Sequence, residues 1–278
     1  MNRSFALLIL VLFPILNGLA QNKKVDKIVE EGRMLYRLEK GSWFGTDHFL
    51  EAFKEKRDSL GGYISYETEN SQISTVFFSR FNPDEVLVRY LFDTIPEVKP
   101  ISVDTVNSAA TPKEKDLYTI RQEARDRAYA NKDKFFTFYE DTALNFIPII
   151  TTKERAVFVL TGPKKGGYVL LGNDYKLIYN KRNAFVKQEK FHNSLLQFPY
   201  RNGESEEPLK STVHSHIITD YITSTDICTL LLYKDYIQWK QHYVISEKQV
   251  SIFDLESEEL ITITRKAWDK IYADQDDD

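Results

Sequence analysis

The sequence contains little cysteine, glycine or proline and has no strong charge excess, and each scarcity excludes a class of protein. A single cysteine in 278 residues excludes a disulfide scaffold and any cysteine-rich zinc module. With 11 glycines and 9 prolines, the chain is neither collagen-like nor of low complexity. Lysine and arginine (37) nearly balance aspartate and glutamate (41). Because a nucleic-acid-binding protein usually carries a basic excess, we expect no nucleic-acid partner.

Apolar and aromatic residues are plentiful. The chain is 42% hydrophobic and contains 18 phenylalanines and 16 tyrosines, which is enough for a sizeable core and excludes a disordered chain. Its length allows one large domain or two small ones.

A short apolar run near the N-terminus is typical of a secretory signal peptide. Arg3 precedes the run Phe5–Leu16, and small residues follow up to Ala20. The run is short for a bilayer span, which takes about 20 residues, and Pro14 interrupts it. We therefore predict export, with cleavage after Ala20, either to a periplasm or out of the cell. We expect no membrane span in the mature chain.

The hydrophobic pattern predicts helices near the N-terminus and then mostly strands, with three further helices among and after them. Apolar residues at helical spacing predict a helix over Lys23–Leu38 that Gly41 ends, and a second helix that begins at Thr46 and closes near Gly61. Further helices are expected from Pro112 to about Asn131, over Ser224–Lys234 and near Tyr272. Runs rich in β-branched and aromatic residues predict strands at Tyr63–Glu67, Ile73–Arg80, Val86–Phe92, Phe135–Tyr139, Phe146–Thr151, Arg155–Leu160, Tyr168–Leu171, Leu177–Tyr179, Ala184–Lys187, Thr212–Ile218, His242–Ser246, Val250–Leu255 and Leu260–Thr264. This layout predicts an α+β fold with a mostly antiparallel sheet and flanking helices.

Three prolines in the stretch 96–112 mark an exposed connection, which is either a linker between domains or a long loop inside one domain. The expected organisation is therefore a signal peptide (1–20), an N-terminal α+β segment (21–95), this connection (96–112), a C-terminal α+β domain (113–273) and an acidic tail (274–278).

Two of the five histidines lie within three residues of each other, in the strand-like run Val213–Ile217. Residues two apart on a strand point to the same face, so His214 and His216 should project side by side. Two imidazoles on one strand face commonly hold a transition metal. Asp226, at the start of the next helix, would supply a third ligand and leave a fourth position for water, as in catalytic zinc sites.

The same residues also have an ordinary structural interpretation. Thr223 and Asp226 have the spacing of an acidic capping box, in which the threonine is the N-cap of the helix. His214 and His216 would then be solvent-facing polar residues of a half-buried strand.

The run from His214 to Ile227 resembles the metal-binding core of the JAMM (MPN+) metallopeptidases, over roughly residues 150–256. That motif is His-x-His-Pro, a short loop, and Ser-x-x-Asp opening a helix. The resemblance implies zinc bound by His214, His216 and Asp226, an oxyanion-stabilising hydroxyl on Thr223 and a general base, for which Glu154 is the candidate. It also implies hydrolysis of amide or isopeptide bonds in a protein or peptide substrate.

The chain departs from this pattern at several points. Ile217 replaces the proline, Thr223 replaces the serine, and His216 and Asp226 are ten positions apart, one fewer than in the motif. A second way of aligning the upstream strand places Lys164 or Lys165 where the family has its glutamate. The alternative function is therefore a non-catalytic exported binding protein on the same fold.

Overall fold

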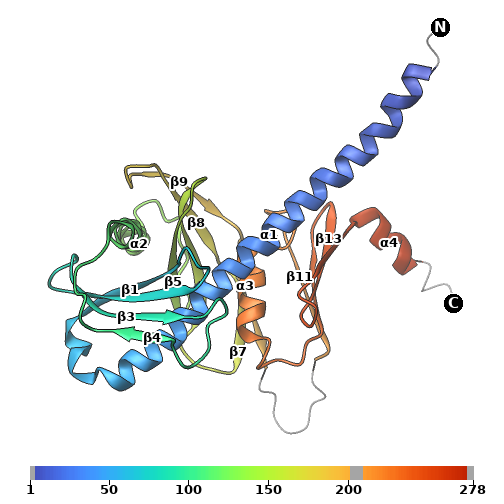
Figure 1. The fold of residues 1–278 in the computed structure, drawn as a ribbon. Helices are drawn as coiled ribbons and strands as arrows, with labels where there is room; N and C mark the ends of the chain where they lie inside the picture. Colours follow the sequence, from blue (N-terminus) through green and yellow to red (C-terminus); the bar gives the residue numbers. More distant parts are fainter. Residues whose placement is uncertain (1–3, 201–208, 274–278) are drawn as a thin grey trace.

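The computed structural model describes residues 4–200 and 209–273, with side chains from 23 to 271. Within these residues the fold is α+β with four sheets, all of whose strand pairs but one are antiparallel, which confirms the predicted class (Figure 1). The predicted cleavage point after Ala20 lies where side chains are not described, and the predicted acidic tail 274–278 lies outside the described residues.

A single long helix, α1 (Ser4–Ala52), crosses the molecule, and its N-terminal part extends beyond the rest of the fold (Figure 1). The prediction of two helices separated at Gly41 was wrong. A Cβ atom on Gly41 would lie 2.8 Å from Cγ2 of Ile73, and one on Gly45 would lie 3.0 Å from Cγ2 of Thr75. These glycines let the helix approach the sheet closely and do not end it.

After a short 3-10 helix, η1 (Lys54–Ser59), the first sheet has the order β1-β2-β3-β4. Its strands are β1 (Leu60–Glu67), β2 (Ile73–Ser79), β3 (Val86–Phe92) and β4 (Ser102–Asp104). Strand β4, which the sequence analysis did not predict, lies within the connection 96–112 and pairs with β3.

Helix α2 (Pro112–Ala130) begins and ends as predicted, with Thr111 as N-cap and Asn131 in the left-handed conformation at its C-terminus. The second sheet follows in the order β5-β6-β8-β9, formed by β5 (Thr142–Ile150), β6 (Arg155–Pro163), β8 (Tyr175–Tyr179) and β9 (Phe185–Lys190). The strand expected at Phe135–Tyr139 is absent. The rings of Phe135 and Phe136 instead pack against Tyr175.

Two smaller assemblies complete the fold. Strand β7 (Tyr168–Gly172) pairs with β10 (Leu195–Pro199), which the sequence analysis missed. The last sheet, in the order β11-β12-β13-β14, contains β11 (Ser211–Ser215), β12 (Gln241–Ile245), β13 (Gln249–Asp254) and β14 (Leu260–Thr264), and α4 (Arg265–Ala273) follows.

Helix α3 (Ser224–Tyr233) connects β11 to β12, the one parallel pair among the described strands, and so forms a β11-α3-β12 crossover. In parallel units, the carboxyl end of a strand and the first turn of the following helix lie at the same edge and commonly form ligand sites.

The main buried core combines side chains from α1, from the first two sheets and from α3 (for example Leu35, Phe77, Phe158 and Leu230). The N-terminal and C-terminal parts of the chain therefore share apolar packing, and α3 packs against α1 and β7. Among the described helices, none combines the length and the apolar character needed to cross a lipid bilayer.

Candidate metal centre

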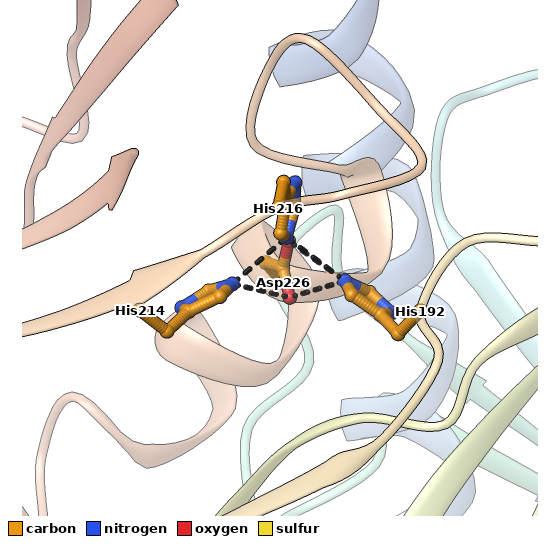
Figure 2. Close-up of side chains that lie close together, drawn as sticks. All are labelled: His192, His214, His216 and Asp226. Atoms are coloured by element: carbon orange, nitrogen blue, oxygen red, sulfur yellow. Dashed lines mark hydrogen bonds and ion pairs between the residues drawn. The ribbon is translucent and has the colours of Figure 1, made fainter. Parts of the chain in front are cut away.

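Four buried side chains converge near the carboxyl end of β11 (Figure 2). His214 lies in β11 and His216 directly follows that strand, with their ring centroids 4.7 Å apart. Asp226 is the third residue of α3, and His192 lies in the loop between β9 and β10. The structure thus brings together the three residues predicted as metal ligands and adds His192.

The spacing of the four donor groups matches a single small metal ion. Their ligand atoms all lie within 4.8 Å of one another. Nε2 of His216 lies 2.8 Å from Nε2 of His214, 3.1 Å from Nε2 of His192 and 3.3 Å from Oδ2 of Asp226. Oδ1 of Asp226 lies 3.2 Å from Nε2 of His192 and 4.0 Å from Nε2 of His214. For metal–ligand bonds of about 2.0–2.1 Å, the edges of a tetrahedron measure roughly 3.3 Å, close to the middle of these values.

Hydrogen bonding at Nδ1 of His216, which faces away from the centre, determines whether Nε2, which faces the centre, presents a lone pair. Nδ1 lies 2.9 Å from the carbonyl oxygen of Tyr221 and 2.7 Å from Oγ1 of Thr219. A carbonyl oxygen only accepts hydrogen bonds, so Nδ1 carries the hydrogen and a neutral His216 presents a lone pair at Nε2. Metal-binding histidines are usually held in this way, through the nitrogen that does not bind the metal.

His214 also has an outer partner, because its Nδ1 lies 2.8 Å from Nε2 of His242. Nδ1 of His192 makes no hydrogen bond with the described residues and faces Oδ2 of Asp174 at 3.6 Å. Consequently all three Nε2 atoms point to the same small volume. Three imidazole nitrogens and a carboxylate at such short range need a cation between them, either a metal ion or a shared proton.

Asp226 is held in place by the capping box that the sequence analysis named as an alternative interpretation. Its Oδ2 accepts hydrogen bonds from the backbone N–H of Thr223 at 2.9 Å and from the Thr223 hydroxyl at 2.7 Å, and its own N–H donates to Thr223 Oγ1. Its Oδ1 accepts no hydrogen bond from the described residues, although the side chain is fully buried. Because a buried carboxylate oxygen rarely lacks a partner, one oxygen of Asp226 serves the helix cap and the other is available to a cation.

Burial and neighbouring charges shift the pKa values of His192, His214 and Asp226 in different directions. Burial opposes a charged His192, but the carboxylates of Asp226 and Asp174 outweigh it and raise the pKa of His192 to about 9. Burial lowers the pKa of His214 to about 4. Burial also opposes a charged Asp226, yet His192 and His216 hold the pKa of that carboxyl well below its usual range. A proton on His192 is therefore the cation of the metal-free centre at neutral pH.

The donor set is three imidazole nitrogens and one carboxylate oxygen, which suits zinc and other first-row transition metals better than calcium or magnesium. The centre is nearly closed to solvent: the side chain of Asp226 is 0% exposed and that of His192 is 7% exposed. A cavity of about 40 Å³ borders the three histidines and Gly172, which is room for a few water molecules and not for a peptide.

The two residues predicted to act on a substrate have other contacts. The hydroxyl of Thr223 donates to Asp226, as described above. The carboxylate of Glu154, in the turn before β6, lies 2.9 Å from the ammonium group of Lys176, which also approaches Glu31 at 3.4 Å. Glu154 is not among the four grouped side chains.

His192 was missed because nothing in the local sequence marks it. It stands alone between Phe191 and Asn193, 22 residues before His214, and only the β9–β10 connection brings it to the centre. The histidine content of the sequence is the one feature that could have indicated His192. The chain has only five histidines, and four of them, including His242, lie at the centre or directly behind it.

Comparisons with protein-family models, with curated proteins and with solved structures find no match for this chain. The case for function therefore depends on the geometry of the centre.

Proposed function

We propose that this protein is an exported zinc-binding protein in which a JAMM-like strand–loop–helix unit holds one zinc ion through His192, His214, His216 and Asp226. The observation that carries the proposal is the buried carboxylate of Asp226 among three imidazole nitrogens: its Oδ1 accepts no hydrogen bond from the described residues and lies 3.2 Å from Nε2 of His192 and 4.0 Å from Nε2 of His214, while its Oδ2 lies 3.3 Å from Nε2 of His216. The JAMM-like assignment is supported by the order of the ligands, with two from the end of a strand and one from the first turn of the next helix.

The arrangement favours a zinc ion that stabilises the fold over one that catalyses a reaction. Catalytic zinc sites have three protein ligands and an open position, whereas structural sites are closed by four. Here His192 supplies the fourth donor. In addition, the Thr223 hydroxyl is engaged by Asp226, and Glu154 is engaged by Lys176. We therefore favour a non-catalytic role, in which the zinc supports a fold that binds other molecules.

Amide or isopeptide hydrolysis is the second candidate, and the small cavity beside the histidines favours it because water can reach the centre there. With an open position, zinc would lower the pKa of a bound water toward about 7 and polarise a substrate carbonyl. Glu154 would hold the proton taken from that water, which requires its carboxylate to leave Lys176.

Metal content of the purified mature chain tests the proposal. We expect about one zinc per chain, removed by a strong chelator and restored by added zinc. Because His214→Asn and Asp226→Asn each remove a ligand, we expect at least a 100-fold loss of zinc affinity. The matched control is His48→Asn, whose imidazole lies near Tyr90 and not at the centre. Failure of the wild-type chain to bind any first-row divalent ion stoichiometrically would refute the proposal.

Hydrolysis is tested separately, with zinc-loaded protein and a set of peptide and isopeptide substrates. We expect no turnover in the wild type. Turnover that disappears in Glu154→Gln, with zinc still bound, would instead establish the second candidate.

A further inference from the structure

We infer that His242 is a positioning residue of the metal centre, which orients His214 and sets the ring nitrogen that His214 presents. The inference rests on the proposed metal site. His242 lies in β12 and is fully buried, and the sequence analysis assigned it no role.

The position of His242 follows from strand pairing. In the parallel β11–β12 ladder, Thr212 lies opposite His242 and His214 lies opposite Val244. The ring of His242 thus lies behind His214, with ring centroids 4.9 Å apart. Its Nε2 is 2.8 Å from Nδ1 of His214, and its Nδ1 is 2.7 Å from Oγ1 of Thr212.

These contacts form a chain of hydrogen bonds whose direction a metal ion at His214 would set. A metal ion at Nε2 of His214 leaves the hydrogen on Nδ1, which donates to Nε2 of His242. A neutral His242 then carries its own hydrogen on Nδ1 and donates it to the Thr212 hydroxyl. The opposite direction would place a hydrogen on the nitrogen of His214 that faces the centre and would exclude a metal ion there, so metal binding requires the direction described.

Apolar neighbours keep the ring of His242 in this position. The rings of Trp239 and Phe198 each lie 6.3 Å from it, centroid to centroid. Both nitrogens of His242 are already used by His214 and Thr212, so His242 acts on the centre through His214 and does not bind the ion itself. Outer partners of this kind typically change metal affinity 10- to 100-fold when they are removed.

The test compares three variants by chelator competition for zinc and by the visible spectrum of the Co²⁺-substituted protein. His242→Phe keeps a ring of similar size but offers no acceptor, and we expect 10- to 100-fold weaker zinc binding and a shifted Co²⁺ spectrum. His242→Gln places an amide oxygen where Nε2 stood, so it should recover most of the affinity. Trp239→Phe is the matched control, because it disturbs the packing beside His242 and leaves the hydrogen-bond chain intact.

The outcomes separate this inference from the metal site itself. If the wild type binds no metal, the proposed function fails and the inference fails with it. If the wild type binds zinc and His242→Phe binds it equally well, or if Trp239→Phe weakens binding as much as His242→Phe, only the inference is wrong. Should His242→Phe not fold, Thr212→Val removes the last acceptor of the chain, and an unchanged affinity and Co²⁺ spectrum in that variant would overturn the inference.

Discussion

At the scale of single residues, the capping box of α3 serves folding and also holds a carboxylate that could bind a metal ion. The capping box satisfies Oδ2 of Asp226 and the first turn of α3, and it thereby fixes the carboxylate with Oδ1 toward His192 and His214. The structural and the functional interpretations of Thr223 and Asp226 are therefore not alternatives. The same hydrogen bonds that cap the helix also fix the carboxylate in an orientation in which it could bind a cation.

Replacing Thr223 tests this double role. Thr223→Val keeps the shape of the side chain but loses both hydroxyl hydrogen bonds to Asp226, so we expect about 1–2 kcal/mol lower stability. Zinc affinity should also fall, because the carboxylate is no longer fixed. Thr223→Ser keeps the hydroxyl and should resemble the wild type in both respects. Denaturant unfolding and chelator competition measure the two effects, and a valine variant as stable as the wild type would contradict the capping role.

The ligands that could be predicted from the sequence are those fixed by local geometry. His214 and His216 share a face because of the period of a strand, and Asp226 follows from the start of the next helix. His192 could not be found in this way, since its approach depends on how the β9–β10 loop packs. A contact between segments that are distant in the sequence produces no regular residue spacing from which a single sequence could predict it.

At the scale of elements, close packing of α1 against α3 positions the first turn of α3. A Cβ atom on Gly32 would lie 2.7 Å from Cβ of Ile227 and 3.0 Å from the carbonyl oxygen of Ser224. Both residues flank Asp226. The glycines of α1 illustrate why helix ends were hard to predict. Glycine is a poor helix former, so Gly41 indicated a helix end, yet close packing against Ile73 requires a glycine at this place inside the helix.

Alanine at two of these glycines separates stability from metal binding. Gly32→Ala and Gly41→Ala both force a contact shorter than 3 Å, so each should lose about 1–3 kcal/mol, even though alanine is the better helix former. Only Gly32→Ala displaces the first turn of α3, so only this variant should also bind zinc more weakly. Thermal unfolding and zinc titration of both variants check this. Equal zinc affinity in the two would show that the α1–α3 contact does not position Asp226.

At the scale of the whole molecule, the centre joins segments that are distant in the sequence. Its ligands come from the β9–β10 loop, from the end of β11 and from α3, and α3 in turn packs against α1. Most regular elements were predictable, because local hydrophobic periods specify them. The short strands β4 and β10 and the approach of the β9–β10 loop to β11 and α3 were not, since these depend on contacts between distant segments. A cation at this point therefore stabilises tertiary structure and not one element.

That stabilisation should depend on pH with opposite sign in the two forms of the protein. Without metal, the His192–Asp226 pair raises the pKa of His192 from 6.5 to about 9, so its contribution is complete below pH 6.5 and is lost as the pH rises toward 9. That loss is at most about 3 kcal/mol. With zinc, protons compete for the same nitrogens, so zinc binding strengthens as the pH rises.

We therefore expect the difference in Tm between zinc-loaded and chelated protein to grow from pH 6.5 to 9, and to reach several degrees once free zinc exceeds its Kd about 100-fold. Calorimetry in matched buffers measures it. His192→Asn should reduce the pH dependence of the chelated form and leave the part due to Asp174 and Glu39, whose pKa values burial raises to about 7. A difference that shrinks over this range would mean that the metal ion and the proton on His192 do not compete for one place.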